Sequence, residues 1–291
     1  MNRVRLYLEL TKPRILVMVL VTTTLGFLLG SPYHGSFASL LLTLLGVGGA
    51  TGGAAVLNNY LERDLDAKMV RTRRRALPAG LIEPHRALTF GVTLVLAGVL
   101  LLATAENLLA GFLVLLAAFL YVLVYTPLKR ITWWNTSLGA IPGAIPPMAG
   151  WAAATGHVGL GAWVLFAILF AWQHPHFFAI AWIFRDDYRA AGFKMLPVVE
   201  PSGLRTVGLA FAFSLALFGV SLVPALIGMT GWLYCAGTSL IGLLMLGAAL
   251  GFACDRSVGN ARRLLKASVL YLPLLLLFII ADAGVKSFAG L

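Results

Sequence analysis

Apolar residues dominate this chain in long runs that short polar segments separate. Each run approaches the roughly 20 residues that a membrane-spanning helix needs. There are nine such runs, at residues 14–31, 37–60, 87–104, 108–126, 133–153, 162–184, 205–224, 231–252 and 264–284. Backbone polar groups inside a bilayer must be satisfied within their own segment, which favours helices. The pattern predicts an all-α polytopic membrane protein, a nine-transmembrane-helix bundle formed by a single domain over residues 1–291.

The composition excludes an ordinary soluble domain. Of the 291 residues, 60% are hydrophobic and only 11% are charged, and the mean hydropathy is +0.91. The two cysteines, Cys235 and Cys254, fall in the same predicted helix, about 28 Å apart. That separation is too large for a disulfide between them. We therefore expect neither a disulfide framework nor a cysteine metal site.

Basic residues are distributed asymmetrically between the predicted loops. In the nine-helix arrangement, 21 of the 22 Lys and Arg residues lie on one side, and Lys286 alone lies on the other. Because cytoplasmic loops retain positive charge, we expect a cytoplasmic N-terminus and an external C-terminus in the cell (inner) membrane. The net charge of +11 is then an orientation signal, and nucleic acid is not an expected partner.

An acidic and then basic segment, NNYLERDLDAKMVRTRRRALP, occupies residues 58–78 at the end of the second apolar run. Asn58, Glu62 and Asp66 are four residues apart and share one helix face, where they offer the oxygen ligands that Mg²⁺ prefers. Arginines follow at Arg71, Arg73, Arg74 and Arg75. Guanidinium groups suit an anionic ligand, so the segment predicts a site for a metal-bound phosphate or diphosphate.

Two further features lie near the same membrane face. Tyr125 and Lys129, in YTPLKR, are four residues apart, and Lys129 is either a snorkelling membrane anchor or a ligand for the anion. The run over 133–153 contains prolines at Pro142, Pro146 and Pro147. We expect them to break that helix. Broken backbone at membrane depth is tolerated only where it is buried in protein or borders a cavity. The sequence thus predicts a central apolar chamber with its polar mouth at the cytoplasmic face, and Asn135 near that mouth.

The run over 162–184 carries Gln173, His174 and His176 near its middle. Polar side chains at such depth usually face a bundle interior and mark a functional site. The two histidines are about 200° apart on a helix and cannot point the same way; a histidine bonded to a neighbouring helix is the commoner explanation for either. Asp187 and Lys194 lie in the following loop, which we expect to face residues 58–78 across the mouth.

Together these residues resemble the intramembrane prenyltransferases of the UbiA type, and among them the protohaem IX farnesyltransferases, or haem O synthases. The superfamily-level features are the amide and two acids at 58, 62 and 66, the Tyr125 and Lys129 pair and the acidic loop. The more specific motifs are NNYLERDLDAKMVRTRRR, PGAIPPMAGW, WQHPHF and DYRAAGFKMLP, and the likeness runs from TKPRI at 11–15 to SVLYLPLLL at 268–276. Three positions depart from the family pattern: Glu62 replaces a frequent aspartate, His174 an apolar residue, and Ala191 the second acid of the later motif.

The resemblance implies farnesyl transfer from farnesyl diphosphate to a vinyl group of haem B, with addition of water, within the lipid bilayer. A haem A synthase is the implied partner that receives the product. The implied catalytic residues are Asn58, Glu62, Asp66, Tyr125, Lys129, His176 and Asp187. Of these, Asn58, Glu62, Asp66 and Asp187 would hold Mg²⁺. Diphosphate would be bound by Arg71, Arg75, Lys129 and Lys194, and haem by Gln173, His176 and Asn135.

Two alternatives remain open at this stage. One is a prenyltransferase for another acceptor, such as a quinone precursor or a chlorin. The other is a transporter whose charged inner mouth binds an anionic solute. Transporters often have paired repeats with broken helices at matching positions, whereas here the expected breaks lie in the run over 133–153 and the acids lie at the membrane interface.

Overall fold

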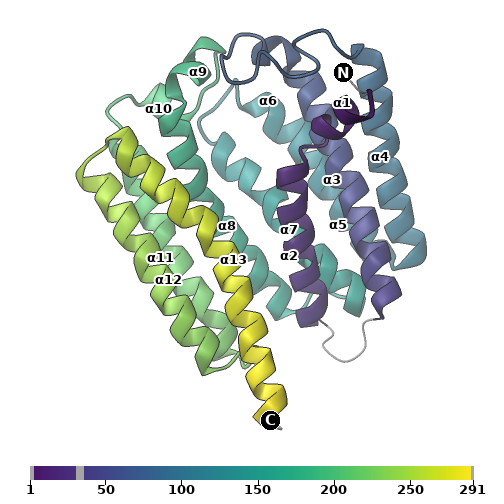
Figure 1. The fold of residues 1–291 in the computed structure, drawn as a ribbon, viewed down its shortest axis with the longest axis vertical. Coiled ribbons are helices and arrows are strands. Elements are labelled where there is room, and N and C mark those ends of the chain that lie inside the picture. The colour runs from purple at the N-terminus through teal and green to yellow at the C-terminus, as the bar shows by residue number, and fades with distance from the viewer. Residues whose placement is uncertain (1–2, 31–35, 290–291) are drawn as a thin grey trace. The chain divides into compact units, whose positions relative to one another are not determined.

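The computed structural model describes residues 3–30 and 36–289, and every regular element within them is helical (Figure 1). The contacts divide the chain into two compact units. The first comprises residues 1–166 and 186–194, and the second comprises residues 167–185 and 195–291. Each unit is described here by itself, and the expectation of one domain over residues 1–291 stays a prediction.

The first unit contains α1 (Arg3–Leu10), α2 (Pro13–Gly30), α3 (Phe37–Asp66), α4 (Pro84–Ala105), α5 (Leu108–Phe119), the π-helix η1 (Leu120–Tyr125), α6 (Thr126–Leu128) and α7 (Asn135–Thr155). The second unit contains α10 (Leu196–Val199), α11 (Leu204–Leu226), α12 (Trp232–Cys254) and α13 (Val258–Ala289). Two helices cross the division: α8 (Leu160–Ile183), mostly in the second unit, and α9 (Arg185–Ala190), mostly in the first.

Eight helical segments in the described part of the chain are long and apolar enough to cross a membrane. They are α2, α3, α4, the continuous Leu108–Leu128 segment, α8, α11, α12 and residues Val258–Ala283 of α13. These correspond to eight of the nine predicted runs. The remaining run, 133–153, forms α7, which is 21 residues long but is not among the apolar spans. The integral membrane character is therefore confirmed, whereas a ninth span stays a prediction.

α7 is one continuous helix, although Pro142, Pro146 and Pro147 lie inside it. The expectation that these prolines break the helix is therefore wrong. Each proline removes one helical N–H donor, but a membrane helix tolerates this where a neighbouring helix packs closely against it. α2 supplies that packing, because a Cβ atom at Gly26 would collide with the carbonyl oxygen of Pro147. On the facing side, a Cβ atom at Gly150 would collide with the carbonyl oxygen of Thr23.

α3 and α4 pack backbone against backbone through glycines. A Cβ atom on Gly53 would lie 2.6 Å from the carbonyl oxygen of Gly91, and one on Gly46 would lie 3.0 Å from that of Gly98. Small residues at such a crossing allow the close approach typical of membrane helices. The polar end of α3 therefore extends from a tightly held helix.

The turns between α3 and α4 fold back over the end of α3 and contact α1, which lies beside the ends of both helices (Figure 1). The contact is apolar, and it comprises Leu6, Leu10, Val56, Ala76, Leu77, Ile82 and Ala87. Burial of these side chains fixes the position of the arginine-containing segment. In the second unit, Asp282 of α13 accepts hydrogen bonds from the backbone N–H groups of Gly231 and Tyr234 at the start of α12, which ties these two helices together.

Candidate functional site

Asn58, Glu62 and Asp66 lie on one face of α3, as their spacing predicts, and all three are buried. Their exposed fractions are 1%, 5% and 1%. Buried carboxylates are costly unless they are paired or bound to a cation. The groups that contact these three side chains therefore indicate which ligands the site can bind.

Each of the three side chains contacts a different cationic side chain. Lys12 Nζ lies 2.6 Å from Asn58 Oδ1, and Lys129 Nζ lies 2.7 Å from Glu62 Oε1. Arg75 Nη1 lies 2.8 Å from Asp66 Oδ2. The cations come from the junction of α1 and α2, from the residue after α6, and from the turns after α3. Three separate parts of the first unit thus converge on one face of α3.

The orientation of the Asn58 amide is set by Thr126. The Thr126 hydroxyl donates its hydrogen to the Tyr121 carbonyl at 2.8 Å, so its oxygen can only accept from Asn58 Nδ2, 2.9 Å away. Asn58 Oδ1 must therefore face Lys12. An amide oxygen directed at a cation is the arrangement that a metal ligand requires.

The Thr126 contact depends on the π-helix η1. The Thr126 backbone N–H bonds the Tyr121 carbonyl, five residues earlier, and the hydroxyl bonds the same oxygen. π-helical turns of this kind are frequent at functional sites. The turn places the Tyr125 ring 4.5 Å from Lys129 Nζ, a cation–π contact. Gly139 of α7 makes room for that ring, since a Cβ atom there would lie 2.5 Å from Tyr125 Cε2.

Lys129 is held inside the protein and does not extend to the membrane surface. Its side chain is only 13% exposed, and it forms an ion pair with Glu62. Burial by itself lowers the pKa of Lys129, but the Glu62 carboxylate, followed by the neighbouring tyrosines, more than offsets this and raises the pKa above its usual value. The snorkelling interpretation is therefore wrong, because the ammonium group is held inside the protein by a carboxylate.

Lys12 is the site residue that sequence reasoning missed. Among the described residues it is the one non-glycine residue with a positive φ, 54°, a conformation that is strained for a long side chain and that clusters at functional sites. Asn59 holds the adjoining backbone by donating to the Leu10 carbonyl at 2.9 Å. Burial, followed by repulsion from Lys129, lowers the pKa of Lys12 to about 7. The sequence did hold a signal for Lys12, which lies directly before Pro13 and between two helices. Counting basic residues alone does not take that position into account.

The loop after α8 meets the arginine segment through Arg71. Arg71 Nη2 lies 3.3 Å from the Tyr188 hydroxyl of α9, and the guanidinium lies 5.6 Å from the centre of that ring. Asp187 is half-buried beside Tyr188 and has no side-chain partner among the residues that the structure describes. The two acidic segments are therefore brought together in the first unit, while the role of Asp187 as a metal ligand stays a prediction.

Lys194 and Asn135 have structural contacts in the same region. The Lys194 backbone N–H donates to the Lys129 carbonyl at 2.7 Å, and the Lys194 side chain is exposed. Asn135 is fully buried and donates its two amide hydrogens to the carbonyls of Thr132 and Lys194. These bonds explain why Asn135 is polar at this depth, and its assignment to haem binding stays a prediction.

The two histidines of α8 point in different directions within the second unit, as their spacing predicts. His174 Nδ1 donates to the Phe170 carbonyl at 2.8 Å, and its ring stacks on Phe213 at 3.6 Å between centres. His176 Nδ1 lies 2.9 Å from Ser268 Oγ of α13, whose hydrogen is given to the Leu265 carbonyl. His176 therefore donates from Nδ1, which leaves its Nε2 lone pair for another partner. Gln173 is buried and donates to its own helix, at the Leu169 carbonyl.

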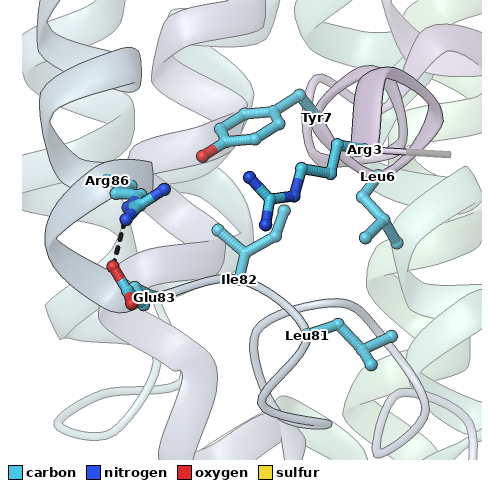
Figure 2. Close-up of a pocket in the computed structure, with 7 residues that line it drawn as sticks. All are labelled: Arg3, Leu6, Tyr7, Leu81, Ile82, Glu83 and Arg86. Atoms are coloured by element: carbon cyan, nitrogen blue, oxygen red, sulfur yellow. Dashed lines mark ion pairs between the residues drawn. The ribbon is translucent and has the colours of Figure 1, made fainter. Parts of the chain in front are cut away.

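A cavity of about 140 Å³ lies elsewhere in the first unit, between α1 and the start of α4 (Figure 2). It is lined by Arg3, Leu6, Tyr7, Leu81, Ile82, Glu83 and Arg86, and Glu83 and Arg86 form an ion pair across 2.7 Å. None of the predicted site residues lines it, so the cavity is separate from the face of α3.

The side chains on α3 fit a hard divalent cation. The donor set is two carboxylates and an amide oxygen, the ligand types of Mg²⁺, and protein cations already lie against all three. Within the described part of the chain, no group of three or more His, Cys, Asp or Glu side chains could hold a metal. A metal at this site would therefore need further ligands, such as phosphate oxygens and water.

Comparison with known proteins places this architecture in a family. The model of the UbiA prenyltransferase family matches residues 19–278, and the chain belongs to that family. Similar relatives include a protein named Protoheme IX farnesyltransferase from Solibacter usitatus, which is 46% identical over 92% of this chain and 95% of its own length. Proteins of the same name from Salinibacter ruber and Aquifex aeolicus are 45% and 39% identical, over 95% and 97% of this chain and 98% and 96% of their own lengths.

Solved structures share the fold. A structure of digeranylgeranylglyceryl phosphate synthase has a TM-score of 0.81 at 18% identity and covers 97% of this chain and 99% of its own. A UbiA homologue from Archaeoglobus fulgidus bound to DMAPP and Mg²⁺ has a TM-score of 0.69 at 18% identity, over 96% of this chain and 99% of its own. At these identities the likeness establishes the fold.

Proposed function

We propose that this chain transfers the farnesyl group of farnesyl diphosphate to a vinyl group of haem B, giving haem O and diphosphate. In this reaction the bond from farnesyl C1 to the diphosphate oxygen breaks, and its electron pair leaves with the diphosphate. The vinyl group forms a carbon–carbon bond to C1, and water adds at the adjacent position and loses a proton. The observation that carries the proposal is the α3 face, on which two carboxylates and an amide are opposed by Lys12, Lys129 and Arg75.

The diphosphate would be bound at this face. Arg75 and Lys129 are the nearest cations, and Arg71 and Lys194 are the proposed outer contacts. Asn58, Glu62 and Asp66, with Asp187, would hold Mg²⁺, which when bound would neutralise charge on the departing diphosphate. The relative of known structure that is bound to DMAPP and Mg²⁺ supports this pairing of ligand and metal.

Haem B is the proposed acceptor because the relatives named Protoheme IX farnesyltransferase match over nearly the whole chain. His176 and Gln173 are the proposed haem contacts, since His176 retains a lone pair at Nε2. Tyr125, under the Lys129 ammonium, would face positive charge that develops on the farnesyl group. Haem O would then pass to a haem A synthase. We place the active face and the N-terminus on the cytoplasmic side of the cell membrane, from the distribution of Lys and Arg.

The proposal is tested by incubating the purified protein with farnesyl diphosphate, haem B and Mg²⁺ and identifying farnesylated haem by mass spectrometry. Glu62→Gln and Asp66→Asn should abolish product while the protein stays folded. An assay in which a quinone precursor or a chlorin competes with haem B distinguishes the alternative acceptors; product formed on those acceptors alone would overturn the haem assignment. A transporter is not favoured, because the similar relatives are named Protoheme IX farnesyltransferase.

A further inference from the structure

The contacts on α3 pair every proposed metal ligand of that helix with one protein cation. Lys12 contacts Asn58 at 2.6 Å, Lys129 contacts Glu62 at 2.7 Å, and Arg75 contacts Asp66 at 2.8 Å. All three ligand side chains are buried, so these contacts satisfy groups that water does not reach. The protein therefore pairs both carboxylates of the face with its own cations.

Such pairing opposes the binding of a metal or a diphosphate alone. A divalent cation on the carboxylates would displace the lysines and the arginine and leave positive charge without a partner, above all at Lys129, whose side chain is only 13% exposed. A diphosphate alone would have to draw the same cations away from Glu62 and Asp66 and leave buried carboxylates without a partner. Removing one partner of a buried ion pair is strongly destabilising, so either ligand alone binds against a penalty.

When both ligands bind, every charge keeps a partner. The metal takes the oxygens of α3, and the phosphate oxygens take the cations that the metal displaces. We propose that Lys12, Lys129 and Arg75 exchange partners in this way, so that Mg²⁺ and diphosphate bind this chain with strong positive coupling. Lys12 thereby joins the proposed diphosphate-binding cations Arg71, Arg75, Lys129 and Lys194. The inference rests on the proposed function only in taking a metal-bound diphosphate as the ligand.

The position of Lys12 supports this role independently of charge. The left-handed backbone at φ 54° aims its side chain at Asn58, and Asn59 anchors the preceding turn through the Leu10 carbonyl. Strained conformations persist where the surrounding structure holds them in place, commonly at ligand sites. A lysine that only marked the membrane surface would need neither the strain nor burial against an amide oxygen.

The test measures the two ligands separately on the full-length protein in detergent. Binding of Mn²⁺ alone, as a probe of the metal site, is followed by loss of the free Mn²⁺ signal in electron paramagnetic resonance. Binding of radiolabelled inorganic diphosphate is measured by equilibrium dialysis, first without divalent metal and then at fixed free Mg²⁺. For the native chain we expect each ligand to raise the affinity of the other by the same factor, within the roughly 5- to 150-fold range of typical coupling.

Lys12→Met separates partner exchange from a structural role. Partner exchange predicts opposite effects: Mn²⁺ alone binds at least about fivefold more tightly, because its competitor is gone, while diphosphate with Mg²⁺ binds at least about fivefold more weakly. Arg75→Met should show the same two opposite effects. It provides a second test in case the Lys12→Met variant does not fold. Lys68→Met is the matched control, since Lys68 is exposed in the turns after α3, and it should change neither affinity.

Unchanged or weaker Mn²⁺ binding in both Lys12→Met and Arg75→Met, with native-like circular dichroism, would overturn the proposal. Uncoupled binding of the two ligands to the native chain would do the same. Neither measurement uses haem or turnover. A chain that couples the ligands but makes no farnesylated haem would therefore contradict the proposed function and leave the exchange supported.

Discussion

Asn58 Nδ2 donates a hydrogen bond of 2.9 Å to the Thr126 hydroxyl oxygen, and this bond decides which atom of the amide faces the site. The hydroxyl hydrogen is committed to the Tyr121 carbonyl, so an inverted amide would leave two acceptors in contact. The π-helix that positions Thr126 thus controls a group on a different helix, α3.

Thr126→Val should remove that control, because valine has the same shape without the hydroxyl. We expect diphosphate affinity in the presence of Mg²⁺ to fall about 10- to 100-fold, as is typical when a group that orients a metal ligand is lost. Thr126→Ser keeps the hydroxyl and should stay within about threefold of the native affinity. Equal losses in the valine and serine variants would show that packing, and not the hydrogen bond, matters at this position.

Lys129→Met should leave the Glu62 carboxylate buried without a partner. We expect a loss of unfolding free energy of about 3–5 kcal/mol, measured as a lower midpoint of thermal unfolding in detergent. Adding Glu62→Gln to the same chain should restore most of the stability, because no buried charge then lacks a partner. Turnover should stay absent in the double variant, which separates the structural from the catalytic contribution of the pair.

Gly139→Ala should disturb the Tyr125 ring, since the new Cβ atom would lie 2.5 Å from Tyr125 Cε2. The Lys129 ammonium lies over the face of the Tyr125 ring, so movement of the ring should shift Lys129 relative to Glu62. We expect kcat to fall about tenfold, the effect of roughly 1.4 kcal/mol on the barrier. Gly208→Ala in α11 has open space around the new atom and serves as the control; an equal loss there would exclude the ring as the cause.

Ser268→Ala should release the His176 ring, because Ser268 Oγ accepts the Nδ1 hydrogen that fixes the tautomer. If His176 contacts haem B through Nε2, haem affinity should fall about 10-fold or more. A titration followed at the haem absorption band measures this directly. Ser239→Ala, where the hydroxyl bonds only its own helix at the Cys235 carbonyl, should leave haem binding unchanged, and a native affinity in Ser268→Ala would argue against His176 as a haem contact.

The predictable part of the site depends on local periodicity. Asn58, Glu62 and Asp66 share a face because a helix repeats every 3.6 residues, and His174 and His176 diverge for the same reason. The expectation for the prolines of α7 was wrong because a local rule was applied where the close packing of α7 on α2, at Gly26 and Gly150, is decisive. The membrane-anchor interpretation of Lys129 was wrong for a similar reason, since the Glu62 carboxylate lies far away in the chain.

The sequence by itself determined the class of this protein, its helical runs and the face of α3 that carries the acids, because hydrophobicity and helix period act over short stretches of chain. The tertiary structure decided the rest. It brought Lys12, Lys129 and Arg75 to Asn58, Glu62 and Asp66, it oriented the Asn58 amide through Thr126, and it strained Lys12 into place. These relations join residues up to 68 positions apart. They arise from packing, which no local pattern of residues specifies.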